Sequence, residues 1–302
     1  MLIVGIDIAK NNHEATIIDA QGNILGKSLS FSNSHAGTNK LLKYIESFNT
    51  KNEEVIFGLE ATGHYWLALY SRLIGEGYVV NVINPIQSDS FRGLYIRQTK
   101  NDSRDSFIIA EVIRFGRYST TQLADEDVLA LRQLCRYRIF MVDQISDLKR
   151  KVIAILDQIF PEYDKLFSDI FGNASKELLL THSTPEEIAA LDTDKLAQIL
   201  SSESRGRLGF DKANQIKSAA QNSFGIKIAV DAFSFQMKQL IEQIKFIEGQ
   251  LKELEQTISE YFRGFNSQIT SIPGIGTVLG AIILSEIGDI KRFSDGSKLV
   301  AF

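Results

Sequence analysis

The chain has 302 residues, of which 44% are hydrophobic and 23% charged, and its formal net charge is −4. This composition is ordinary for a globular protein of about two domains. The single cysteine, Cys135, excludes an internal disulfide framework and a cysteine-built zinc site, and the four histidines show no paired ligand spacing. The apolar stretches are too short to span a membrane and the N-terminus lacks a basic signal-peptide region, so we expect a cytoplasmic protein.

The first part of the chain predicts a mixed sheet with helices. An apolar run at 2–9 is followed by β-rich segments around the turn at 20–23, which indicate a hairpin. The remaining predicted elements are a helix over 34–48, a strand over 55–59, a helix over about 65–76, a strand over 79–83 and a helix over about 102–117. The order βββαβαβα is that of a ribonuclease H-like α/β sheet, in which the first strand, the end of the fourth strand and the last helix converge at one edge.

Four acidic residues fall where this topology would bring them together. Asp7 lies in the apolar run LIVGIDIA, Glu60 closes VIFGLE, and Asp102 and Asp105 lie three residues apart in KNDSRDS. A carboxylate in an apolar strand is costly unless something neutralises it, and the i, i+3 spacing places the last two on one helix face. Four such carboxylates predict a site for two Mg²⁺ ions, with Mn²⁺ as a substitute, which cleaves or joins phosphodiesters by in-line displacement. Alternatively, Glu60 and Asp102 are ordinary carboxylates at helix N-termini.

Basic residues are concentrated between residues 92 and 151, where twelve lysines and arginines accompany eight acidic residues. A locally basic surface suits a phosphate backbone, although solvated helix faces explain the pattern equally well. The predicted nucleic-acid contacts beside the acidic pair are Arg97, Lys100 and Arg104. Tyr65 and Trp66 could stack on a base, but packing in a core is the more common fate of such aromatics.

Beyond about residue 125 the pattern is helical, and two heptad-like series predict long helices. One runs from Met141 to Ile159 before Pro161, and the other from Met237 to Tyr261 with charged flanking positions. The second series is typical of a coiled coil about 37 Å long, with buried bundle helices as the alternative. The two series could pair as a hairpin within one chain or form the seam of a dimer. Between them, the sequence of residues 162–230 predicts short helices, and no catalytic or ligand-binding motif is found there.

The segment at 271–290, SIPGIGTVLGAIILSEIGDI, predicts a tight turn followed by a helix of small residues. Gly274 and Gly276 would present backbone N–H groups at a helix N-terminus to a phosphate, and a plain helix–helix connector is equally consistent. The glycine spacing does not match a dinucleotide-binding fingerprint, and no strand precedes it.

Five motifs occur in order along the chain: GIDIAK around Asp7, EATGHY around Glu60, VINP at 82–85, KNDSRD at 100–105 and SIPGIG at 271–276. Together they resemble the DEDD transposases of the insertion-sequence one-ten group, a family that also includes the Piv-type DNA invertases. The resemblance implies a RuvC-like catalytic domain over 1–120, a coiled-coil connector over 121–265 and the start of a C-terminal transposase domain over 266–302. It also implies that Asp7, Glu60, Asp102 and Asp105 form the metal-binding tetrad.

The resemblance further implies a recombinase of an insertion sequence that is guided by a structured bridge RNA, which pairs with donor and target DNA. We expect a homo-oligomer, either a dimer through the coiled coil or a tetramer in synapsis. Family members continue past a segment like KLVAF to a domain with a nucleophilic serine, whereas this sequence ends at Phe302. We therefore expect a shortened chain that does not complete recombination alone, and neither Ser294 nor Ser297 matches the nucleophile. The family's KTDxxDA motif is KNDSRDS in this sequence. Both carboxylates are kept, so we expect a site whose properties are altered and not an inactive one.

Three other functions fit parts of the sequence. A stand-alone Mg²⁺-dependent nuclease of Holliday junctions would use the same carboxylates with water as the nucleophile. A non-catalytic remnant would bind RNA equally well without the tetrad. Residues 5–25 also resemble the first phosphate loop of actin-like and sugar-kinase-like ATPases, but the second Asp-Gly-rich motif of that superfamily is not found downstream.

Overall fold

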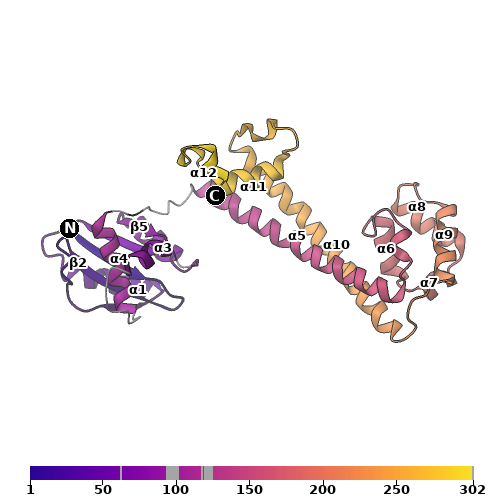
Figure 1. Cartoon of the computed structure of the whole chain (residues 1–302), viewed down its shortest axis with the longest axis horizontal. Coiled ribbons are helices and arrows are strands. Elements are labelled where there is room, and N and C mark those ends of the chain that lie inside the picture. The colour runs from indigo at the N-terminus through magenta and orange to yellow at the C-terminus, as the bar shows by residue number, and fades with distance from the viewer. Residues whose placement is uncertain (62, 93–101, 117, 119–124, 301–302) are drawn as a thin grey trace. The chain divides into compact units, whose positions relative to one another are not determined.

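The computed structural model describes residues 1–61, 63–92, 102–116, 118 and 125–300, and at 92, 102 and 292 it describes the backbone only. Contacts divide the chain into two compact units, Met1–Leu123 and Ala124–Phe302 (Figure 1). Each unit has its own hydrophobic core.

The N-terminal unit is built on a five-stranded sheet with the strand order β3-β2-β1-β4-β5. The strands are β1 (Leu2–Asp7), β2 (Asn12–Asp19), β3 (Leu29–Ser32), β4 (Val55–Glu60) and β5 (Val79–Ile83). β2 runs antiparallel to β1 and β3, whereas β4 runs parallel to both β1 and β5. This arrangement is the ribonuclease H-like sheet that the sequence predicted.

The helices of this unit are α1 (His35–Glu46), α2 (Leu67–Gly75), α3 (Pro85–Arg92) and α4 (Asp102–Phe115). The sequence predicted all of them except α3. This helix begins directly after β5, where the side-chain oxygen of Asn84 accepts a hydrogen bond from the N–H of Ile86 at 2.9 Å. Pro85 occupies the first helical position, where its missing N–H is not needed.

Each face of the sheet has its own core, because successive side chains of a strand point to opposite faces. Val4, Ile6 and Phe57 pack with side chains of α1 and α2 on one face. Ile3 and Ile83 pack with side chains of α4 on the other. The odd-numbered residues of β1 and the even-numbered residues of β4 therefore face α4.

Two glycines let α4 lie directly on the sheet. A Cβ atom on Gly5 would lie only 2.1 Å from the carbonyl oxygen of Ser106 and 2.4 Å from the backbone nitrogen of Ala110. A Cβ atom on Gly58, the neighbour of Gly5 on β4, would lie 2.6 Å from Cγ1 of Ile113. Real Cβ atoms do not approach other atoms so closely, so any larger residue at these positions would displace the helix or its side chains.

The first turn of α4 lies toward the carboxyl end of β1. Thr16 of β2 hydrogen-bonds through Oγ1 to the hydroxyl of Ser106 at 2.7 Å and donates to the carbonyl oxygen of Ser103 at 3.2 Å. A later turn of the helix approaches the other end of the sheet. A Cβ atom added to Gly22 there would lie 3.0 Å from Nε of Arg114. The helix therefore runs antiparallel to β1.

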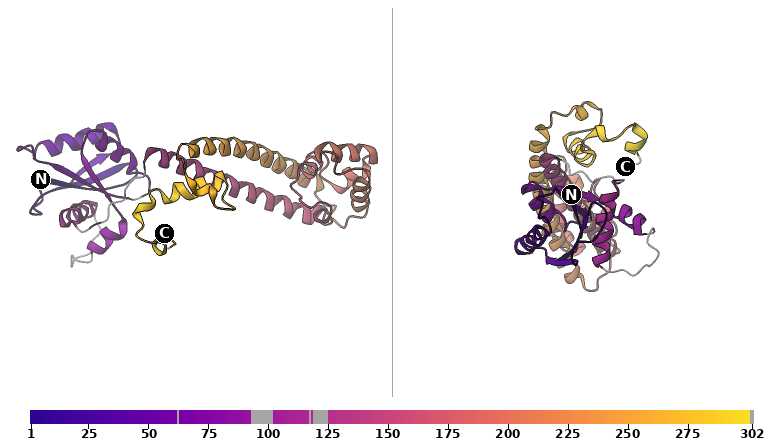
Figure 2. Two further views of the ribbon diagram at one scale, coloured as in Figure 1. Left: turned by 90° about the horizontal axis from the view of Figure 1, so that it is seen from above. Right: turned by 90° about the vertical axis from the view of Figure 1, so that its left-hand side faces the viewer.

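The C-terminal unit is organised around α5 (Glu126–Ile159) and α10 (Val230–Arg263), each 34 residues long. The two helices lie side by side and antiparallel in both views (Figures 1 and 2). Both belong to one chain, so the heptad series pair as a hairpin, which is one of the two arrangements that the sequence left open, and their seam is filled by intrachain contacts. Arg138 of α5 and Glu255 of α10 form an ion pair at 2.7 Å along this seam.

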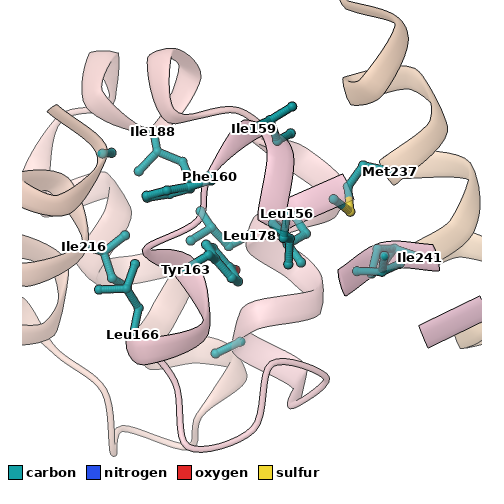
Figure 3. Packing of buried hydrophobic residues seen from close by; sticks show 14 of the residues in the cluster. Leu156, Ile159, Phe160, Tyr163, Leu166, Leu178, Ile188, Ile216, Met237 and Ile241 are labelled. Carbon is teal, nitrogen blue, oxygen red and sulfur yellow. The ribbon is translucent and has the colours of Figure 1, made fainter. Parts of the chain in front are cut away.

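A cluster of short helices packs where α5 ends and α10 begins. It comprises η1 (Tyr163–Lys165), α6 (Asn173–Thr181), α7 (Pro185–Ala190), α8 (Thr193–Glu203) and α9 (Phe210–Gln221). Figure 3 shows Phe160 next to Ile188 in its core, with Leu156 of α5 on the side of Met237 and Ile241 of α10. Short helices were predicted here, and α7 begins with a capping box as its TPEE sequence indicates.

The last described segment contains η2 (Gln268–Ser271), α11 (Thr277–Ile287), η3 (Ile290–Arg292) and α12 (Gly296–Val300). α11 packs on α5 and α10 through a small core that includes Ala281. Arg136 of α5 donates two hydrogen bonds to the Glu286 carboxylate, at 2.7 and 2.9 Å. Within the described part of the chain, every helix is too short or too polar to cross a bilayer.

Candidate active site

Asp7 and Glu60 end two neighbouring parallel strands. The register pairs Ile6 of β1 with Leu59 of β4, so the next position on each strand is an acidic residue. Neighbouring strands lie about 4.8 Å apart. Asp7 and Glu60 each lie two residues after a glycine that contacts α4, so their side chains point to the same face of the sheet as those glycines. The structure therefore brings Asp7 and Glu60 together at the carboxyl edge of the sheet, on the face that α4 covers.

Glu60 is only 9% exposed, which makes its charge costly unless it is compensated. Ser88, a fully buried residue of α3, donates a hydrogen bond to Oε2 of Glu60 at 2.8 Å. This bond fixes the orientation of the carboxylate. Ser88 was not among the predicted site residues. The signal that could have found it is Asn84-Pro85, which starts a helix whose first turn carries position 88 back toward β4.

Asp102 and Asp105 lie in the first turn of α4, at the end of the helix that overlies the carboxyl edge of β1. Asp105 is half-buried, and the side chain of Asp102 lies outside the described residues. The backbone thus places the helical pair at the same edge as the two strand carboxylates.

The residue types at this edge fit a divalent metal. Carboxylate oxygens are the ligands that Mg²⁺ prefers, and two neighbouring carboxylates, one of them buried, repel each other unless a cation compensates them. Among the side chains that the structure describes, no three histidine, cysteine or acidic groups approach closely enough to form a metal cluster by themselves. That set does not contain Asp102.

His13 supports the turn that follows Asp7. Its Nδ1 accepts a hydrogen bond from the N–H of Ala9 at 3.2 Å, and its ring packs edge-on against Phe31. Burial lowers the pKa of His13, and a hydrogen bond with Asn33 opposes this shift. The imidazole is therefore neutral at pH 7, on the sheet face opposite α4.

Much of the predicted basic surface is paired within the chain. Among the described residues of this stretch, five arginines and one lysine form ion pairs with carboxylates: Arg114 with Glu111, Arg132 and Arg136 with Glu286, Arg138 with Glu255, Lys149 with Glu248 and Arg150 with Asp147. These pairs favour a structural role for those basic residues over a phosphate-binding surface. Of the three predicted contacts beside the acidic pair, Arg97 and Lys100 lie outside the described residues, and Arg104 is half-buried in the first turn of α4.

The turn before α11 leaves its backbone accessible. Gly274 has a φ of +90°, which favours glycine, and Gly276 precedes the helix without a side-chain cap. A Cβ atom on either residue would meet no other atom within 4 Å. Trp66, in contrast, is buried and donates a hydrogen bond to the carbonyl of Gly63 at 3.1 Å, so it packs in the core as the alternative reading expected.

Two transposase family models match the chain. A DEDD transposase model of the IS110 type matches residues 4–161, more than half of the sequence. The chain belongs to this transposase family. A second model, for transposases of the IS116/IS110/IS902 family, matches residues 266–302. These matches confirm the resemblance carried by the five sequence motifs and establish a DNA transposase.

The transposase has relatives in Streptomyces. The protein named as the mini-circle transposase for IS117 from Streptomyces coelicolor is 26% identical over 310 residues, covering 99% of this chain and 74% of that protein. A 44.8 kDa protein of insertion element IS116 from Streptomyces clavuligerus is 25% identical over 305 residues, with the same coverage.

Among solved structures, Thermus thermophilus RuvC in complex with a Holliday junction substrate is similar to this chain. It is 13% identical with a TM-score of 0.30, and the similarity covers 40% of this chain and 99% of that one. The fold assignment rests on the strand order and connections described above, because a TM-score this low adds no weight to it.

Proposed function

We propose that this transposase cleaves and exchanges DNA strands in a reaction that depends on divalent metal ions held by Asp7, Glu60, Asp102 and Asp105. The observation that carries the proposal is the register of β1 and β4. It sets Asp7 beside Glu60 at one edge of the sheet, directly where the first turn of α4 begins.

The chain's own residues would prepare this site before DNA binds. Ser88 holds the Glu60 carboxylate in one orientation, and Thr16 anchors the first turn of α4, which carries the aspartate pair. Mg²⁺ or Mn²⁺ bound there would supply positive charge at the scissile phosphate and activate the attacking oxygen. A preorganised set of carboxylates avoids the cost of rearranging charged groups during the reaction.

We further propose that a structured bridge RNA selects the donor and target DNA, and that the attacking oxygen comes from a serine outside the present sequence. Family membership supports both proposals, and the chain covers 74% of the length of each Streptomyces relative. The proposed phosphate contacts are Arg104, in the first turn of α4, and the open turn at Gly274 and Gly276 before α11.

The helix pair of α5 and α10 is proposed to act as a coiled-coil connector within one subunit. Its heptad seam is occupied by intrachain contacts, so the proposed homo-oligomer would have to use the outer faces of these helices or other surfaces.

The metal dependence is tested by comparing three variants of the chain. Asp7→Asn and Glu60→Gln should abolish Mn²⁺ binding measured by titration calorimetry and any Mg²⁺-dependent cleavage of donor DNA. Glu46→Gln is the matched control, because Glu46 is an exposed residue of α1 on the opposite side of the sheet. Cleavage that proceeds equally in EDTA, or Mn²⁺ binding that survives both site substitutions, would refute the proposal.

A further inference from the structure

Glu14 stands directly across β1 from Glu60, with Asp7 between them. The antiparallel register pairs Glu14 of β2 with Asp7 of β1, and opposed residues in such a pair have Cα atoms about 4.5–5.5 Å apart. Glu14 shares the parity of Thr16, which hydrogen-bonds to α4, and of Ile18, which packs in the α4 core. It therefore belongs to the same face as Asp7.

The three residues form an acidic row across three adjacent strands, Glu14 on β2, Asp7 on β1 and Glu60 on β4. Glu14 is half-buried, and no described residue forms a hydrogen bond or an ion pair with its side chain. Like charges directly opposite each other in a sheet are destabilising, and a partly buried carboxylate gains most from a nearby cation. Among the described residues, none compensates the charge at this position.

We propose that Glu14 is a fifth carboxylate of the metal site, positioned on the β2 side of Asp7. Divalent ions such as Mg²⁺ keep several bound waters, and carboxylates just outside the ligand shell accept hydrogen bonds from those waters. Glu14 thereby raises the affinity of the site for the ion and fixes the orientation of its water ligands. This inference rests on the proposed metal-dependent function, and it makes Glu14 a positioning residue.

The test is a Mn²⁺ titration of the whole chain, by calorimetry, for wild type, Glu14→Gln, Asp7→Asn and the control Glu46→Gln. Loss of a supporting carboxylate typically weakens metal affinity about 10- to 100-fold, which is the expected effect of Glu14→Gln. The second readout is the urea midpoint of the N-terminal unit in EDTA. Here Glu14→Gln should equal or exceed wild type, because the substitution removes a half-buried charge that no described residue compensates. A purely structural role would lower this midpoint instead.

The outcomes separate this inference from the function on which it rests. If Asp7→Asn loses Mn²⁺ binding while Glu14→Gln stays within about twofold of wild type, Glu14 has no part in the site and the metal proposal stands. If neither substitution changes binding, both ideas fail. If Glu14→Gln lowers the midpoint in EDTA, Glu14 serves the fold and the inference is overturned.

Discussion

Replacing Gly5 with alanine is the most revealing perturbation of this fold, because it acts at the contact between β1 and α4. The added methyl group would lie 2.1 Å from the carbonyl oxygen of Ser106 and 2.4 Å from the nitrogen of Ala110. Both atoms belong to the helix backbone, so no change of side-chain rotamer can relieve the clash. α4 must move away from the sheet and take Asp105 with it.

The size of the effect follows from what the new methyl group meets. Overpacking of a core typically lowers the free energy of unfolding by about 1–3 kcal/mol. We expect Gly5→Ala to lower it by about 3 kcal/mol, because the new methyl group would clash with backbone atoms. Gly58→Ala should cost about 1–2 kcal/mol, since its methyl group would meet the movable Ile113 side chain at 2.6 Å. Gly75→Ala is the control, because a Cβ atom there would meet nothing within 4 Å, and it should change stability by no more than about 1 kcal/mol.

The assay uses the single tryptophan of the chain. Trp66 is 6% exposed in the core of the N-terminal unit, so its fluorescence during urea unfolding reports that unit and not the helical one. The same three variants can be titrated with Mn²⁺, and Gly5→Ala should also bind the ion more weakly. If Gly5→Ala unfolded at the same urea concentration as Gly75→Ala, α4 would not rest on the sheet as described.

Two further substitutions test the surroundings of the acidic edge. Ser88→Ala removes a hydrogen bond to the buried Glu60 carboxylate and should lower the free energy of unfolding by about 1.5–3 kcal/mol in the Trp66 assay. Ser90→Ala is the control, because the Ser90 hydroxyl on the same helix is exposed, and it should leave the free energy of unfolding nearly unchanged. Equal effects of the two substitutions would contradict the role given to Ser88. Burial lowers the pKa of His13, so the unfolded chain takes up a proton before the folded one does. The stability that this histidine gives is therefore full above its unfolded pKa of about 6.5 and is lost as the pH falls toward the lower folded value. His13→Leu should flatten the dependence of the urea midpoint between about pH 7.5 and 5.5, and an unchanged slope would show that another group causes it.

Local patterns predicted most of the N-terminal unit, because strands, turns and caps are encoded in short stretches of sequence. The hairpin around residues 20–23, the cap at Ser34 and the strand that ends at Glu60 all follow from such patterns. The short helix α3 escaped prediction because its eight residues carry no clear apolar periodicity. The positions of Asp7, Glu60, Asp102 and Asp105 could be expected from the topology alone.

Contacts between segments that are distant in the sequence could not be predicted. Glu14 becomes an interesting residue only when the β1–β2 register places it opposite Asp7. Arg136 and Arg138 look like part of a basic surface until the fold supplies Glu286 and Glu255 as their partners. The heptads likewise could not distinguish a hairpin from a dimer seam, because the same periodicity serves both.

The central claim is that side chains from β1, β4 and α4 share one divalent metal site. Anomalous diffraction from crystals of the transposase grown with Mn²⁺ tests it most directly. We expect an anomalous peak in direct ligation contact with carboxylate oxygens of both Asp7 and Glu60, next to the first turn of α4. Mn²⁺ found only elsewhere on the protein, with that edge of the sheet empty, would contradict it.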